Sequence, residues 1–250
     1  MKTLFVSLLL LVSGVSVSAQ SAAPVEKPVA TGEKKAPHPS FAEIEDVEGL
    51  PRVLILGDSI SMGYTQPVRA ALKGEANVHR PKANCGPTDN GLKFLDEWLG
   101  DGEWDVIHFN WGLHDVMHYL NGVAKEDRVS HTTEGAFRRN SPGQYEEKLR
   151  ELVARLQETG ATLIWASTTP IPESSKGLWK PGDAALYNKV AARVMEDNGI
   201  AVDDLWSFAK PELAAIQKDR DVHFSSEGSA VLGDEVARVI REALKVHRSK

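Results

Sequence analysis

The sequence predicts an α/β protein in which helices cover both faces of a parallel sheet. Short apolar runs alternate along the chain with longer segments of mixed polar and apolar residues. The apolar runs are continuous and do not alternate with polar residues, which is typical of strands buried on both faces. Residues 51–250 are numerous enough to form one domain with a sizeable core.

The individual elements follow in regular order. In the clearest helix, over residues 144–159, apolar side chains recur at helical spacing and Gly160 follows the last turn. Strands are expected at residues 52–56, 77–80, 104–110, 161–167 and 200–203, and helices at residues 66–73, 91–99, 144–159, 184–197 and 230–246. Helices between successive strands favour right-handed parallel crossovers, so we expect a three-layer α/β/α sandwich with a flavodoxin-like parallel sheet of about five strands.

The N-terminal region predicts export. Residues 1–19 begin with Lys2, continue with an apolar run too short to span a bilayer, and end in small residues at Ala19, as in a signal peptide. Residues 20–50 are rich in Ala, Pro, Lys and Glu and are expected to be a disordered linker. We therefore expect a secreted or periplasmic protein with no integral membrane segment after cleavage, whose folded domain spans residues 51–250.

Composition argues against several partners and cofactors. The chain has 29 basic and 35 acidic residues and a formal net charge of −6, with no long basic run, so nucleic acid is not an expected partner. Cys85 is the only cysteine, and we expect it to be a small packed residue and not a nucleophile. The chain has no HExxH motif and no cluster of Cys and His, so neither a metal nor another cofactor is expected.

Polar residues gather where the predicted strands end, which is where parallel sheets bind their ligands. Residues 57–59 follow the first strand, residues 84–86 lie in the next loop, and residues 111–115 follow the strand at 104–110. Ser59 at a strand-to-helix turn suits either a nucleophile or a helix N-cap. His223 suits its general base or a loop histidine with no role.

Four short segments follow one another along the chain: Val-Leu-Ile-Leu-Gly-Asp-Ser-Ile at 53–60, Cys-Gly-Pro-Thr at 85–88, Gly-Leu-His-Asp at 112–115 and Asp-Val-His at 221–223. They resemble, in the same order, the signature blocks of the SGNH (GDSL-type) serine hydrolases. The resemblance implies ester hydrolysis through an acyl-enzyme on Ser59, with His223 as base. It also implies that the backbone N–H groups of Ser59 and Gly86 form part of the oxyanion hole.

The sequence departs from the family pattern at two positions. His114 stands where the family usually has the asparagine that completes the oxyanion hole; an imidazole N–H can replace it, and Asn110 is a second candidate. Arg220 occupies the usual position of the catalytic acid, which leaves Asp221 or Asp219. We favour Asp221, because side chains two residues apart in an extended segment point the same way.

The remaining expectations concern loops and substrate. Asp58 and Asp115 are expected to anchor loops, whereas Trp111, His118 and Trp179 suit either ligand stacking or the core. Export suggests an O-acetylated polysaccharide as substrate, which would make the protein an acetylesterase. The family also includes lipases and thioesterases, and a non-catalytic binding protein on the same fold is the competing class.

Overall fold

The computed structural model describes residues 36–173 and 177–247, and its compact unit begins at Pro37. The signal peptide expected at 1–19, and the expected linker up to residue 35, lie outside the described residues. The end of that linker is ordered, because polar side chains of the domain bind its backbone. Gln66 Nε2 donates to the Pro39 carbonyl at 2.6 Å, and the Val47 N–H donates to Asn77 Oδ1 at 2.9 Å. The domain boundary expected at residue 51 is therefore too late.

Five parallel strands form the central sheet, as the sequence predicts. They are β1 (Arg52–Leu56), β2 (Asn77–His79), β3 (Val106–Phe109), β6 (Thr162–Ala166) and β7 (Ala201–Asp203), in the order β2-β1-β3-β6-β7. The chain first adds β2 on one side of β1 and then crosses to add β3 on the other. In sheets of this kind, the crevice at such a reversal is the usual ligand site.

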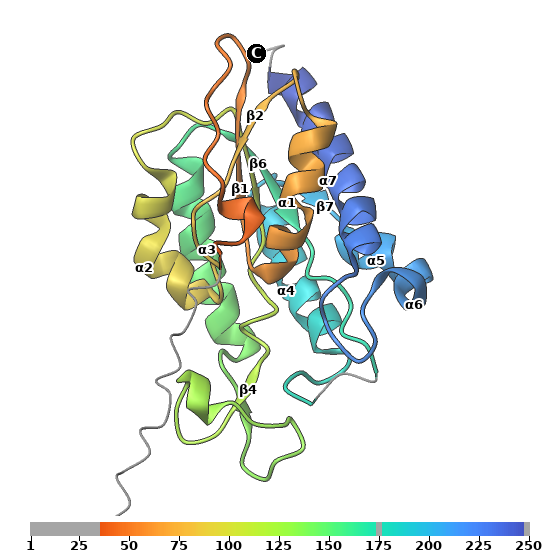
Figure 1. The fold of residues 1–250 in the computed structure, drawn as a ribbon. Helices are drawn as coiled ribbons and strands as arrows, with labels where there is room; N and C mark the ends of the chain where they lie inside the picture. The colour runs from red at the N-terminus through yellow and green to blue at the C-terminus, as the bar shows by residue number, and fades with distance from the viewer. Residues whose placement is uncertain (1–35, 174–176, 248–250) are drawn as a thin grey trace, which may run out of the picture. The chain divides into compact units, whose positions relative to one another are not determined.

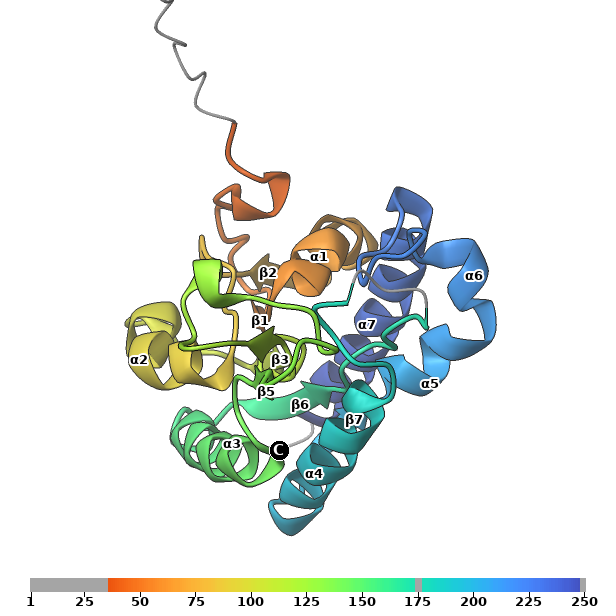
Figure 2. The ribbon, with the colours of Figure 1, turned by 90° about the horizontal axis from the view of Figure 1, so that it is seen from below.

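Helices cover both faces of the sheet (Figures 1 and 2). One face carries α1 (Ser59–Ala71) and α7 (Ser226–His247), and the other carries α2 (Thr88–Leu99), α3 (Pro142–Gln157) and α4 (Asp183–Asp197). The 3-10 helix η1 (Pro39–Phe41) packs on α1, and α5 (Leu205–Ala209), η3 (Lys210–Glu212) and α6 (Leu213–Ile216) lead towards α7. Alternate strand residues divide between two apolar clusters: Leu54 and Leu56 join one, Val53 and Ile55 the other. The three-layer α/β/α class is thus confirmed.

Three helices begin earlier than their apolar periodicity indicates. α1 starts at Ser59 instead of residue 66, because the Asp58 side chain accepts the Ile60 N–H at 2.9 Å and caps the helix there. α2 starts at Thr88 and α7 at Ser226, a few residues before the expected 91 and 230. The first turns of α2 and α7 are polar and carry no apolar repeat, so periodicity alone misses them.

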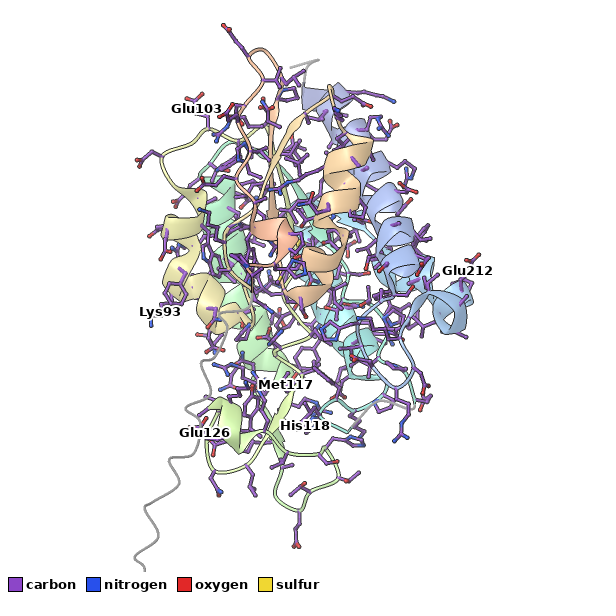
Figure 3. The ribbon with its side chains drawn as sticks, viewed as in Figure 1. Lys93, Glu103, Met117, His118, Glu126 and Glu212 are labelled. Atoms are coloured by element: carbon purple, nitrogen blue, oxygen red, sulfur yellow. The ribbon has the colours of Figure 1, made fainter. Side chains whose placement is uncertain are left out.

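A long insertion separates β3 from α3, and the sequence did not predict its structure. It contains the short antiparallel strands β4 (His118–Tyr119) and β5 (Phe137–Arg138) and the 3-10 helix η2 (Lys125–Asp127). Figure 3 shows Met117, His118 and Glu126 of this insertion at the end of the domain opposite Glu103, which precedes β3. The insertion therefore lies beyond the carboxyl ends of the strands. Of the helices described, none is long and apolar enough to cross a bilayer.

Candidate active site

Ser59 lies at the carboxyl end of β1, as the first residue of α1. Two residues shape the turn that presents it. Gly57 allows a close approach, since a Cβ there would lie 2.9 Å from Ser61 Oγ, and Asp58 caps the helix. The Ser59 hydroxyl is accordingly placed where the sheet topology expects a ligand.

The structure brings Ser59, His223 and Asp221 into a hydrogen-bonded chain. Ser59 Oγ lies 2.8 Å from His223 Nε2, and His223 Nδ1 lies 2.7 Å from Asp221 Oδ1. Because an ionised carboxylate only accepts hydrogen bonds, Asp221 holds the proton of the neutral imidazole on Nδ1. Nε2 is then left with a lone pair that can accept the Ser59 proton. This is the geometry that nucleophilic catalysis by an alcohol requires.

A tight turn brings Asp221 to His223, in place of the extended segment that we expected. The Lys218 N–H donates to the His223 carbonyl at 2.9 Å, and the Asp221 N–H donates to the Lys218 carbonyl at 3.2 Å. Arg220 adopts a left-handed conformation, with φ of 53°. Asp219 is exposed. The argument from extended geometry is therefore wrong, although Asp221 is still the carboxylate that meets the imidazole.

Gly86 lies in a loop that is bonded to the Ser59 turn, since the Cys85 N–H donates to the Gly57 carbonyl at 3.1 Å. Gly86 has a φ of 59°, in the left-handed region that favours glycine, and a Cβ there would lie 2.7 Å from Asn90 Nδ2. The Gly86 N–H donates to Asn84 Oδ1 at 3.0 Å. An oxyanion would have to share or displace this amide acceptor, and its charge makes it the stronger one.

The buried side chain of Arg80 ties the two loops together. Its Nη2 donates to the carbonyls of Gly57, at 3.2 Å, and Ala83, at 3.0 Å, while Nη1 donates to Ser61 Oγ at 3.1 Å. The carbonyls belong to the residues just before the Asp58–Ser59 turn and the Asn84–Gly86 loop. Arg80 therefore sets the spacing of nucleophile and oxyanion donor. The sequence carried no local signal for this role.

The two candidates for the last oxyanion donor have different surroundings. Asn110 Nδ2 donates to the Ala166 carbonyl at 2.7 Å and to Thr168 Oγ1 at 3.3 Å, so its amide protons are engaged at the end of β6. His114 is partly buried and lines the same cavity as Gly86. Among the described residues, no hydrogen-bond partner of its ring is found. The geometry thus favours His114.

The charge state of His114 also fits donation by a neutral ring. Burial lowers the pKa of His114, as do the nearby cations Arg128 and Arg139, while Asp58 opposes them. A neutral imidazole carries one N–H, which can serve the oxyanion if the tautomer places it there.

We expect His114→Ala to lower kcat by about 10²–10³, the usual effect of removing one oxyanion donor. His114→Asn should recover much of this loss, because its amide restores an N–H. Steady-state kinetics on a short-chain ester would measure both. Asn110→Ala is the comparison: if it gave the larger loss while His114→Ala gave almost none, the donor would be Asn110.

The other residues singled out in the sequence lie in supporting positions. Asp115 is buried and accepts hydrogen bonds from the Thr88 hydroxyl and Asn140 Nδ2, and burial raises the pKa of its carboxyl to about 6. Trp111 is part of the core, and Trp179 Nε1 donates to the Leu113 carbonyl at 2.9 Å. His118 is buried in the insertion.

Cys85 is buried beside Gly86. Burial raises the pKa of the Cys85 thiol to about 11, which keeps it protonated at neutral pH. Within residues 36–173 and 177–247, no group of three or more His, Cys, Asp or Glu side chains is placed to hold a metal ion.

A serine hydrolase of the SGNH type is the class that this fold and site indicate. The model of the GDSL-like lipase/acylhydrolase family matches residues 55–231, and the chain belongs to that family. The resemblance noted in the four sequence blocks is thereby confirmed, and so is the enzyme class. A search of curated protein sequences returned no match.

Solved structures with the same fold include several esterases. The lipase/acylhydrolase from Enterococcus faecalis has a TM-score of 0.62 at 18% identity, over 77% of this chain and 96% of its own. The acetyl xylan esterase AlAXEase has a TM-score of 0.59 at 16% identity, over 76% and 99%. The acetylxylan esterase Axe2 from Geobacillus stearothermophilus has a TM-score of 0.57 at 19% identity, over 76% and 94%. At these identities the likeness shows the fold.

Proposed function

We propose that the protein is an exported esterase that removes acyl groups from a carbohydrate through an acyl-enzyme on Ser59. The observation that carries the proposal is the chain of two short hydrogen bonds, 2.8 Å from Ser59 Oγ to His223 Nε2 and 2.7 Å from His223 Nδ1 to Asp221. Export is supported by the signal-like residues 1–19.

The reaction proceeds in two steps. Ser59 Oγ attacks the carbonyl carbon of the ester while its proton passes to His223 Nε2, and the oxyanion accepts hydrogen bonds from Ser59, Gly86 and His114. The bond to the alcohol oxygen then breaks as His223 returns the proton to that oxygen. Water repeats the attack on the acyl-enzyme, which releases the carboxylic acid and restores the Ser59 hydroxyl.

The substrate class is supported by the surroundings of Ser59 and by structural neighbours. A groove of about 560 Å³ is lined by Ser59 and His223. The leaving alcohol can extend along this groove and still receive its proton from His223. Its lining combines apolar side chains such as Ile60, Met62 and Phe224 with the polar side chains of Gln66, Lys218, Ser225, Ser226 and Ser229, a mixture that suits both the apolar faces and the hydroxyls of a sugar. Two of the structures with this fold are acetylxylan esterases, which makes an acetyl group the first acyl group to test.

Labelling with a fluorophosphonate, followed by mass-spectrometric mapping, tests the proposal. A catalytic serine forms a covalent phosphonyl adduct, and we expect it on Ser59, with parallel loss of activity on 4-nitrophenyl acetate. Acetate release from an acetylated polysaccharide then tests the carbohydrate. A protein that neither reacts with the label nor hydrolyses acetyl or butyryl esters would be a binding protein on this fold.

A further inference from the structure

A second cavity, of about 270 Å³, lies on the oxyanion side of the candidate site. It is lined by Gly86 and His114, to which we assign oxyanion roles, and by five further side chains that can donate hydrogen bonds: Asn84, Asn90, Tyr119, Arg128 and Arg139. Among the described residues that line it there is no aspartate or glutamate. Its wall is therefore rich in hydrogen-bond donors and carries positive charge.

Arg128 is the charged side chain in this wall that has no acceptor among the described residues. Its Nε is buried and unbonded, and within the described part of the chain its guanidinium makes neither a hydrogen bond nor an ion pair. The backbone holds the residue in place, since Arg128 forms a β-bridge with Tyr119 and its N–H donates to the Lys125 carbonyl at 3.4 Å. A half-buried guanidinium without an acceptor is costly, and a bound anion would remove that cost.

Arg139, in contrast, is held by the protein. Its Nε donates to Asp89 Oδ2 at 3.0 Å, its Nη1 donates to the Val123 carbonyl at 3.1 Å, and its guanidinium lies 5.7 Å from the Tyr119 ring centroid. Asp89 is shared with Lys148, at 2.7 Å, so one carboxylate faces two cations. Arg139 is therefore fixed by protein acceptors, whereas Arg128 is not.

Resting on the proposed esterase function, we infer that this cavity binds a carboxylate of the substrate through Arg128, so that acidic esters are the preferred substrates. The planar guanidinium forms paired hydrogen bonds with a carboxylate, and Arg139, which lines the same cavity, adds to the attraction. The carboxylate belongs either to the alcohol half, as in an acylated uronic acid, or to the acyl half, as in a dicarboxylic acid hemiester. In both cases the cavity next to the oxyanion donors favours a substrate whose carboxylate lies close to the reacting carbonyl.

Matched substrate pairs test this inference. Acetylated methyl galacturonoside and acetylated methyl galactoside place the carboxylate, or its neutral counterpart, in the alcohol half. Methyl hydrogen succinate and methyl butyrate do so in the acyl half. We expect wild-type protein to show a higher kcat/KM for the acidic member of one pair, which identifies the half. Arg128→Gln should reduce that preference, as a ratio of kcat/KM values, by about 10- to 100-fold.

The exposed Lys125 provides a matched control, because it lies in the same insertion without lining the cavity. Lys125→Gln removes the same charge and should keep the preference. Arg128→Lys, which retains the charge but not the planar fork, should give an intermediate ratio. Circular dichroism of each variant verifies that it is folded.

The outcomes separate this inference from the function on which it rests. Hydrolysis of the neutral esters without preference in either pair, or a preference that survives Arg128→Gln, would overturn the anion site and leave the esterase intact. If no ester is hydrolysed, calorimetric titration with galacturonate and succinate still decides. Binding to wild type that Arg128→Gln abolishes supports the site, whereas no binding to wild type refutes it.

Discussion

Ser59→Ala should abolish turnover of a short-chain ester, with a loss of about 10⁶ in kcat, and leave the fold intact. The variant removes the atom that lies 2.8 Å from His223 Nε2, so no acyl-enzyme can form. The oxyanion donors remain, and a small residual rate of water attack is expected. Initial rates would measure the loss in kcat and the residual rate. Intact-protein mass spectrometry after mixing with substrate would show whether an acyl-enzyme forms.

The control for this variant is Ser207→Ala, which removes the hydroxyl of an exposed serine on α5. It should retain wild-type turnover, and both variants should show the wild-type circular dichroism spectrum. Helix α1 should persist in Ser59→Ala, since its cap is provided by the Asp58 side chain. If Ser59→Ala kept full activity, Ser59 would be only a first-turn residue of α1.

Asp221→Ala should reduce kcat by up to about 10⁴, less than the loss of Ser59. Without the carboxylate 2.7 Å from Nδ1, nothing fixes the imidazole tautomer or stabilises the imidazolium that forms during attack. The effect should fall mainly on kcat and leave KM nearly unchanged, because Asp221 acts through His223. Steady-state kinetics over a range of ester concentrations would separate the two parameters.

Asp219→Ala is the matched comparison, since Asp219 lies in the same turn but is exposed. It removes the same charge and should leave kcat within a small factor of the wild-type value. A large loss from Asp219→Ala together with a small one from Asp221→Ala would move the acid to Asp219. The roles proposed for Ser59 and His223 would not be affected by that result.

The sequence predicted the architecture because the features that specify it are local. Continuous apolar runs and helical repeats lie within single elements, and the Gly57–Ser59 turn follows its strand directly. Parallel pairing then follows from the alternation of strands and helices. The starts of α2 and α7 were misplaced because their first turns are polar. The order of residues 37–50 was missed because distant side chains such as Gln66 and Asn77 bind them.

The sequence by itself determined the family, the fold and the residues worth testing, namely Ser59, His223 and a short set of alternatives. Only the tertiary structure decided which of these alternative residues lie in contact with the catalytic groups. The turn at 218–223 brings Asp221 to the imidazole, and the end of β6 engages the amide of Asn110. The tertiary structure also brings together the loops and the insertion that form the cavity around Arg128. Such contacts join residues far apart in the chain, and no local pattern encodes them, because their geometry depends on how the layers pack.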